Sequence, residues 1–385
     1  MAKREAAAAT KPAAIINPFE KVSNVMRELN SHYGKELVRT GENIHSIHKV
    51  PFDEPTLDWV SDGGIPIGRI TEFLGDTHSG KTRNALRAMR QFQKYCFNCH
   101  TPNALDIVWR TDRRNNPYVE SCSCKNCAEP TPTIQVMIDI EGTTDPIFMK
   151  NFGIDINGVI YVRPDMPSQA IGIADTFLRM PNVGLILFDS IGSMGADKEV
   201  VTAIEDDKMN QNPLFFNKAM RKWQMALNSN TNETGKENGT SMIVVNQSYT
   251  TLGNYSTEVP QGGRGIRHGK GMSLKTRIRE KSKEPNSNKV VGVHIDYRNE
   301  KNKTGMPYRR KEYYLNLNPD DPNIAYCHTN VTLQYVELAL EMGIIEQKGA
   351  WFYYANEKYQ GKANLIDGFD EDMRESVNKQ LYGKK

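Results

Sequence analysis

The chain has 385 residues, of which 38% are hydrophobic and 25% charged, and this predicts one large domain with appendages. No apolar run approaches the roughly 20 residues of a membrane span. The alanine-rich first ten residues lack the apolar segment of a secretory signal, so we expect a disordered tail and a cytoplasmic protein without a membrane partner. The net charge of +3 is too small to indicate nucleic-acid binding, so any basic surface must be local.

Residues 18–33 predict an amphipathic helix that Gly34 ends. We expect its apolar stripe to be buried, either by packing on the chain's own core or by docking on a neighbouring subunit. The residues of the stripe are Phe19, Val22, Val25, Met26 and Leu29.

Residues 75–82 fit G-x-x-x-x-G-K-[ST], a phosphate-binding loop. The glycines let successive backbone amides point at a phosphate, while Lys81 would reach the β- and γ-phosphates and Thr82 would ligate Mg²⁺. An apolar strand at 69–74 and a helix at 82–93 provide the context that the motif requires. The loop residues are Gly75, Asp76, Thr77, His78, Ser79, Gly80, Lys81 and Thr82.

Alternating strands and helices follow, and they predict a mostly parallel sheet with helices on both faces. The strands are expected at 134–140, 183–188 and 241–245, and the helices at 168–180 and 213–227. Ligands of such sheets bind at the carboxyl ends of the strands, where Glu141, Asp189 and Gln247 lie. Asp189 fits a Walker B carboxylate that steadies Mg²⁺ through water, and Glu141 is placed to orient a water that attacks the γ-phosphate.

The second half of the core predicts loops and an antiparallel extension. Residues 228–239 are polar and predict a solvated loop, and residues 248–272 form a longer glycine-rich loop with basic side chains. Strand-like alternation at 274–279, 290–297 and 312–317 predicts antiparallel strands that extend the sheet. A small C-terminal module with a helix at 331–342 begins near residue 320.

Five of the six cysteines fall between residues 96 and 127, which indicates a metal site rather than a disulfide framework. Two C-x-x-C pairs have the spacing of a zinc ribbon, in which four thiolates bind Zn²⁺. Cys122 could replace Cys124 as a zinc ligand, and His100 is a less favoured alternative ligand. Contact with DNA, contact with an acidic partner and a purely structural role all stay open for this insertion. The expected ligands are Cys96, Cys99, Cys124 and Cys127.

Several segments resemble the RecA family of bacterial recombinases. They are YGKELVRTGE, GGIPIGRITEFLGDTHSGKT, MIDIEGTTDP, LILFDS, VVNQ and GAWFYYANEKYQGKAN. The matches run from about residue 18 to 370 and are interrupted by the cysteine-rich insertion. The resemblance implies a RecA-like ATPase core with an N-terminal oligomerisation helix and a small α+β C-terminal domain.

The resemblance also implies roles at the nucleotide. Lys81, Thr82 and Arg83 would bind ATP and Mg²⁺, together with the Walker B residue Asp189, and Glu141 would activate water. Asp145 and Phe148 fall where the family holds adenine, although the family commonly has tyrosine at the second position. Gln247 falls where the family senses the γ-phosphate. Lys301 and Lys303 match lysines that reach the ATP of the adjacent subunit, where the residues alone would favour a charged surface hairpin.

Residues 195–211 and 248–272 match the two DNA-binding loops of the family. Basic side chains among glycines in the second loop suit a phosphate backbone. The first loop offers Lys208 and Met209 but is otherwise acidic, which weakens the prediction that it contacts DNA. The implied DNA-binding residues are Lys208, Met209, Gly262, Gly263, Arg264, Arg267, His268 and Lys270.

Four regions are therefore predicted: a tail, polymerisation helix and linker at 1–44, the core at 45–322 with its zinc insertion at 96–130, and a C-terminal domain at 323–385. The predicted function is an ATP-dependent recombinase for DNA repair, which forms filaments on single-stranded DNA and exchanges strands with homologous duplex. Single-strand-binding and mediator proteins are further candidate partners. A ring-forming helicase or branch-migration ATPase, and a non-catalytic recombinase paralogue, are the alternatives.

Overall fold

The computed structural model describes residues 20–33, 38, 40–41, 46–114, 116–193, 212–233, 239–250, 258–261 and 263–383. The chain divides into two units, residues 1–46 and 47–385. The first unit contains helix α1 (Glu20–Tyr33), which agrees with the predicted helix to within two residues. Val22, Val25 and Leu29, three residues of its apolar stripe, are exposed.

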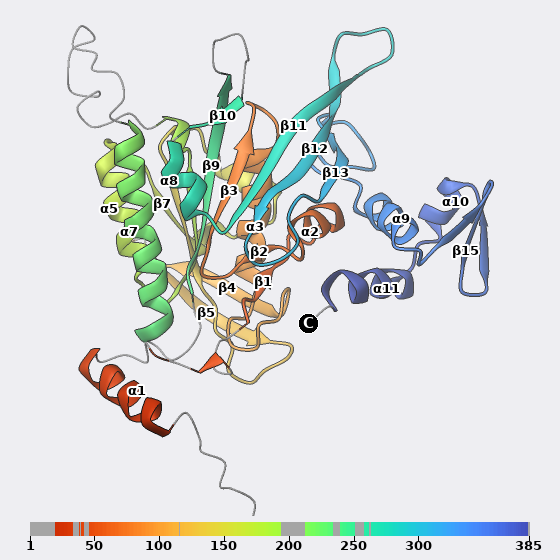
Figure 1. Ribbon diagram of the computed structural model, residues 1–385. Coiled ribbons are helices and arrows are strands. Elements are labelled where there is room, and N and C mark those ends of the chain that lie inside the picture. Colours follow the sequence, from red (N-terminus) through yellow and green to blue (C-terminus); the bar gives the residue numbers. More distant parts are fainter. Residues whose placement is uncertain are drawn as a thin grey trace, which may run out of the picture. The chain divides into compact units, whose positions relative to one another are not determined.

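The second unit is built around one large sheet with the strand order β13-β12-β11-β3-β9-β8-β6-β7 (Figure 1). All pairings from β11 to β7 are parallel, which confirms the predicted α/β class. The strands are β3 (Ile70–Gly75), β6 (Ile134–Asp139), β7 (Val159–Val162), β8 (Val183–Asp189), β9 (Ser241–Thr250), β11 (Met272–Lys283), β12 (Val290–Asn302) and β13 (Arg310–Asn316).

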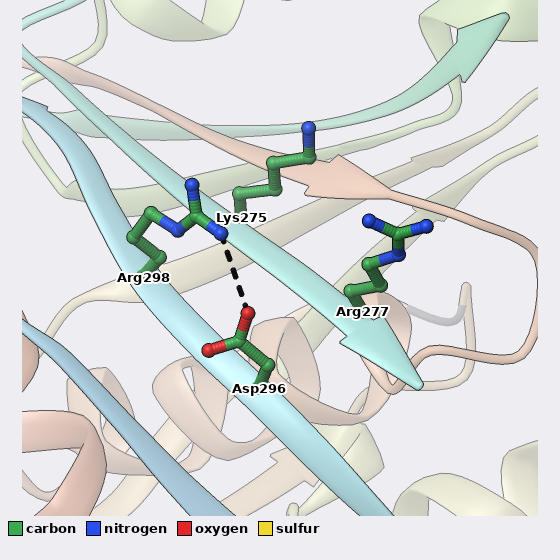
Figure 2. Close-up of a pocket in the computed structure, with 4 residues that line it drawn as sticks. All are labelled: Lys275, Arg277, Asp296 and Arg298. Carbon is green, nitrogen blue, oxygen red and sulfur yellow. Dashed lines mark hydrogen bonds and ion pairs between the residues drawn. The ribbon is translucent and has the colours of Figure 1, made fainter. Parts of the chain in front are cut away.

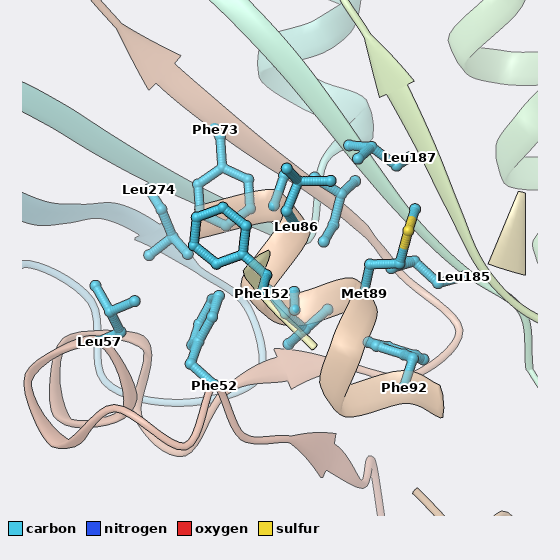
Figure 3. Packing of buried hydrophobic residues seen from close by; sticks show 14 of the residues in the cluster. Phe52, Leu57, Phe73, Leu86, Met89, Phe92, Phe152, Leu185, Leu187 and Leu274 are labelled. Atoms are coloured by element: carbon cyan, nitrogen blue, oxygen red, sulfur yellow. The ribbon is translucent and has the colours of Figure 1, made fainter. Parts of the chain in front are cut away.

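Helices cover both faces of this sheet because its central strands carry apolar side chains on both sides. On one face, α3 (Lys81–Lys94) packs Leu86 near Phe73 of β3 and Met89 near Leu185 of β8 (Figure 3). On the other face, α5 (Pro167–Leu178) and α7 (Asn212–Glu233) enclose Trp223 and Phe188, whose rings lie 5.2 Å apart. None of the helices that the structure describes is long and apolar enough to cross a lipid bilayer.

Two predicted loops are wrong in part. Helix α7 continues to Glu233, because adding residues to an existing helix costs far less than nucleating one. Strand β9 continues to Thr250 and pairs antiparallel with β10 (Glu258–Pro260), so Gln247 lies inside a strand rather than at its end. Helix α8 (Gly263–Gly269) also lies in the segment predicted as loop.

Strand β11 corrects the predicted antiparallel extension. It runs parallel to β3, with Met272 opposite Thr71, and the antiparallel pairing begins only between β11 and β12. The segment that contains α8 carries the chain from the end of β9 to the start of β11, beside the start of β3, and a parallel neighbour requires such a crossover. Alternation of apolar and polar residues along a strand predicts which face is buried, but not whether the strand runs parallel or antiparallel to its neighbour.

The cysteine-rich insertion forms a hairpin of β4 (Leu105–Thr111) and β5 (Pro117–Cys124). It follows α3 and precedes β6, so it lies at the amino-terminal edge of the parallel strands, opposite the phosphate loop. Trp109 of β4 is buried, and a Cβ atom on Gly158 would come within 2.9 Å of its indole ring. The insertion is therefore packed against the core.

The C-terminal module has its own apolar core, which includes Val336 and Leu365. It contacts α2 (Pro55–Ser61), where the Gln334 side chain accepts a bond of 3.1 Å from the Thr56 amide and the Tyr382 hydroxyl donates to Asp58 at 2.8 Å. Its elements are α9 (Val331–Glu341), β14 (Glu346–Lys348), β15 (Trp351–Tyr354), β16 (Glu357–Gln360), α10 (Lys362–Asp367) and α11 (Glu371–Tyr382).

Candidate nucleotide-binding site

The loop between β3 and α3 has the backbone of a phosphate cradle. Gly75 has a φ of 154°, and a Cβ atom there would lie 2.2 Å from the Thr276 carbonyl oxygen of β11, so only glycine fits. Gly80 has a φ of 85° and His78 a φ of 62°. The Ser79 hydroxyl donates to the Asp76 carbonyl at 2.7 Å, which fixes the bend. The loop thus delivers backbone amides to the start of α3, where the helix end favours an anion.

Lys81 lies within this loop with 7% of its surface exposed. Its ammonium donates to the Asp76 carbonyl over 2.6 Å. Burial lowers the pKa of Lys81, while the carboxylates of Asp189, Asp76 and Glu141 act in the opposite direction. A poorly hydrated ammonium group of this kind favours a ligand with negative charge.

Thr82 and Asp189 come together as a pair of oxygen ligands. The Thr82 hydroxyl donates to Asp189 Oδ2 at 2.9 Å, joining α3 to the end of β8. The pKa of Asp189 is raised to about 6: burial is the largest cause, the bond from Thr82 and the charge of Lys81 act against it, and Glu141 and Asp139 add to it. Hydroxyl and carboxylate oxygens beside a phosphate cradle fit Mg²⁺.

Glu141 is brought to the same edge because β6 and β8 are parallel neighbours, with Asp139 opposite Asp189. The Ser190 hydroxyl donates to Glu141 Oε1 at 2.6 Å and so orients the carboxylate. The sequence analysis missed this serine, although its place directly after Asp189 is a usable signal.

Asp139 was also missed, and it holds the turn after Glu141. Its carboxylate accepts the Gly142 amide at 2.8 Å, the Thr144 amide at 2.9 Å and the Tyr161 hydroxyl at 2.9 Å. Although burial opposes the change, these bonds lower the pKa of Asp139.

The two residues expected at adenine lie on α4 (Pro146–Asn151) and its cap, just after this turn. Asp145 caps the helix by accepting the Ile147 amide at 2.7 Å. The Phe148 ring is half-buried and packs edge-on against Phe152 at 5.1 Å.

Arg83 departs from the expectation for the phosphate loop. Its buried guanidinium forms an ion pair with both oxygens of Glu54 and donates to the Cys327 carbonyl at 3.1 Å. The side chain is therefore committed to the core, and only its backbone is left for a nucleotide.

We expect Arg83→Ala to destabilise the fold by about 3 kcal/mol, because the buried Glu54 carboxylate loses its two-pronged partner and keeps only the 3.5 Å ion pair with Arg87. Urea unfolding measures this change. Arg179→Ala is the matched control, since it breaks an exposed pair with Asp175 and should cost less than about 1 kcal/mol. Equal losses from the two substitutions would contradict the assignment.

Gln247 lies in β9 opposite Gly75 of the phosphate loop. Its carbonyl accepts the Gln261 amide at 3.0 Å, which ties the strand to the segment that leads into α8. The neighbouring Asn246 is buried and donates to Glu72 at 2.9 Å and to the Gln261 carbonyl at 3.0 Å. The strand that borders the phosphate loop is thereby bonded to the glycine-rich segment.

Lys270 differs from its predicted role as an exposed basic residue. It has 5% of its surface exposed, and its ammonium forms an ion pair with the buried Glu72 and donates to Ser273 at 2.9 Å. Lys270 is therefore not part of the candidate DNA surface. Arg267 and His268 on α8 are exposed, as that surface requires. The predicted DNA contacts of Lys208, Met209 and Gly262 lie outside the described residues, as does the side chain of Arg264, and Gly263 is the first residue of α8.

Lys301 and Lys303 meet the last turn of α8. The Lys301 ammonium donates to the Arg267 carbonyl at 2.6 Å, and that of Lys303 donates to the His268 carbonyl at 3.3 Å. The pKa of Lys301 is lowered, chiefly by burial and further by the positive charges of Lys303 and Lys270, while the negative charge of Glu72 acts in the opposite direction. A surface cavity of about 440 Å³ lies beside them, and its lining includes Arg267, Lys270, Lys275, Lys301 and the acidic Glu300. Such a cavity suits an anion.

A second group of cations, which the sequence analysis missed, lies on the outer face of β11 and β12 (Figure 2). Lys275, Arg277 and Arg298 line a pocket of about 150 Å³ around Asp296. The Asp296 carboxylate is buried and accepts from Arg298 at 3.4 Å. Cations at every second residue of β11 were the available signal. Their excess over carboxylates allows this face to bind a phosphate group.

The four expected cysteine ligands converge at the base of the β4–β5 hairpin. Their sulfur atoms all lie within 4.8 Å of one another, with 3.6 Å between Cys96 and Cys127 and between Cys99 and Cys124. Zn–S bonds of about 2.3 Å put tetrahedral sulfurs about 3.8 Å apart, so this group could bind zinc. Cys122 is not part of the group.

The fold and this constellation define a P-loop nucleotide-binding protein of the α/β class, with its site at the carboxyl ends of parallel strands. Residues 125–318, just over half of the chain, match the model of the RecA N-terminal domain family, and the chain belongs to the RecA family. It is 25% identical over 354 residues to the protein RecA of Mycoplasma mobile, which covers 90% of this chain and 91% of that one. The RecA of Acinetobacter baumannii is 26% identical over 93% of this chain and 89% of its own length.

Proposed function

We propose that this protein is an ATP-dependent recombinase that polymerises on single-stranded DNA and promotes pairing and strand exchange with homologous duplex. The observation that carries the proposal is the meeting of Lys81, the Thr82–Asp189 pair and Glu141 at one edge of a RecA-family sheet. Each of these groups has a role in phosphoryl transfer to water.

In this proposal Lys81 and the loop amides bind the β- and γ-phosphates of ATP. Thr82 and Asp189 hold Mg²⁺, which supplies positive charge to the phosphates when it is bound. Glu141, oriented by Ser190, accepts a proton from the attacking water. Gln247 reports the γ-phosphate to the glycine-rich segment through the bonds that join β9 to Gln261.

The nucleotide would lie between two copies of the chain. Lys301 and Lys303 line the cationic side of α8, where the cavity suits the phosphates of a neighbouring protomer's ATP. The exposed apolar stripe of α1 would dock on that neighbour. Arg267 and His268 on α8 would contact the DNA backbone.

Electron microscopy with single-stranded DNA and a slowly hydrolysed ATP analogue tests the assembly. An open helical filament is expected, and a closed ring would overturn the proposal in favour of a helicase. Strand exchange measured with zinc present and chelated then tests the activity and its dependence on the insertion.

We further propose that Cys96, Cys99, Cys124 and Cys127 hold one Zn²⁺ per chain. The buried apolar residues of the insertion are few, so thiolate coordination would supply most of its stability. We expect Cys124→Ser to lose the metal, whereas the matched Cys122→Ser keeps it because Cys122 lies outside the sulfur group. Elemental analysis of the purified variants measures this, and equal zinc contents would contradict the assignment.

A further inference from the structure

Two histidine rings join the cysteine-rich insertion to the start of the core. His48 and His100 stack face to face, with ring centroids 3.7 Å apart and an angle of 3° between their planes. Both side chains are half-buried. His100 Nδ1 also lies 3.3 Å from the hydroxyl of the buried Tyr95, so its ring is held from a second direction.

The cysteine group fixes the position of His100. This residue directly follows Cys99 and has a left-handed φ of 53°, which is uncommon for a residue other than glycine. The Cys96 amide donates to the Thr101 carbonyl at 3.1 Å, which closes the turn. A metal ion shared by Cys96 and Cys99 would hold both ends of this turn, so the place of the His100 ring depends on the metal site.

His48 marks the point where the N-terminal segment joins the core, since the second unit begins at Ile47. The joint itself is short. Strand β1 (Lys49–Val50) pairs with β2 (Ile65–Pro66) through two residue pairs, and the His48 carbonyl accepts the Ile67 amide at 2.9 Å. A two-stranded ribbon of this length is marginal by itself. From Lys49 onward the chain is also held by the ion pair of Lys49 with Asp62 and by the buried Val50, so the histidine stack acts on His48, the last residue before β1.

We propose that the metal-held Cys96–Cys99 turn clamps His48 through His100, so that self-assembly of the protein depends on metal in the insertion. The clamp fixes where the segment that carries α1 leaves the core. A free joint would let that segment sample more directions, and docking on a second copy would then lose more conformational entropy. The inference rests on the proposed role of α1 in assembly, and it gives the insertion a regulatory function.

The test is the protein concentration at half-maximal assembly on single-stranded DNA with an ATP analogue, followed by light scattering. His100→Ala should keep its zinc and its affinity for ATP but raise this concentration roughly three- to tenfold, as loss of one ring pair implies. Chelated wild-type protein should show at least the same rise. His294→Ala, which removes a ring packed on Tyr314 elsewhere in the core, is the matched control and should assemble normally.

Hydrogen exchange at the Ile67 amide reports the joint directly, and it should accelerate in His100→Ala and after chelation. A chain that begins at Ser46 separates the two ideas. If this truncated chain assembles like the full chain, the proposed role of α1 fails. If the truncated chain does not assemble, but His100→Ala and the chelated protein assemble at the wild-type concentration, the clamp is overturned.

Discussion

Lys81→Ala should lower DNA-stimulated ATP turnover by a factor on the order of 100 to 1,000 and weaken ATP binding. Lys81 is nearly buried, and its ammonium interacts with the carboxylates of Asp189, Asp76 and Glu141. Without it, these carboxylates would face the phosphates of ATP with no compensating cation from the loop. Phosphate release in the presence of single-stranded DNA measures turnover, and fluorescence titration with a nucleotide analogue measures binding.

Lys94→Ala is the matched control for this substitution. Lys94 lies in the last turn of the same helix, α3, so its removal changes the same residue type at the end remote from the loop. Turnover of this control should stay within twofold of wild type. A Lys81→Ala protein that hydrolyses ATP as fast as the control would refute the assignment of the phosphate loop.

Glu141→Gln should keep ATP binding but slow hydrolysis by about 100-fold or more, because the amide cannot accept the proton of the attacking water. The substitution preserves the size of the side chain, and its oxygen can still accept the Ser190 hydroxyl. Filaments should therefore form and persist, since the step that releases DNA is slowed. Single-turnover hydrolysis and the lifetime of filaments after dilution measure the two effects.

Glu120→Gln is the control for Glu141→Gln, because it changes an exposed glutamate of the insertion that pairs with Arg110. It should hydrolyse ATP at the wild-type rate. The rate of ATP hydrolysis by Ser190→Ala should fall between those of Glu141→Gln and Glu120→Gln, since this substitution removes the bond that orients Glu141 but leaves the carboxylate. Fast hydrolysis by Glu141→Gln would assign the role of base to another residue.

The strands and helices near the phosphate loop were predictable because their signals are local. Strand β3 and helix α3 match the predicted boundaries to within one residue, as does the run that forms β8. These elements carry continuous apolar runs or a motif whose backbone geometry glycine dictates. Strand β10 was missed because its three residues, Glu258–Pro260, are too few to show a strand period, and pairing with β9 stabilises it. Helix α8 was missed because glycine and basic residues dominate its sequence, and bonds from Lys301 and Lys303 stabilise its last turn.

The sequence by itself determined the phosphate loop, the strand-end positions of Glu141 and Asp189, and the spacing of the four cysteines, because each depends on neighbours within a few residues. Only the tertiary structure decided the partners of the long cationic side chains. It places Arg83 on Glu54 and Lys270 on Glu72, and it stacks His100 on His48. The physical reason is that a charged or aromatic side chain takes the partner that packing brings to it, and that partner can be distant in the chain, as Glu72 is from Lys270, 198 residues away.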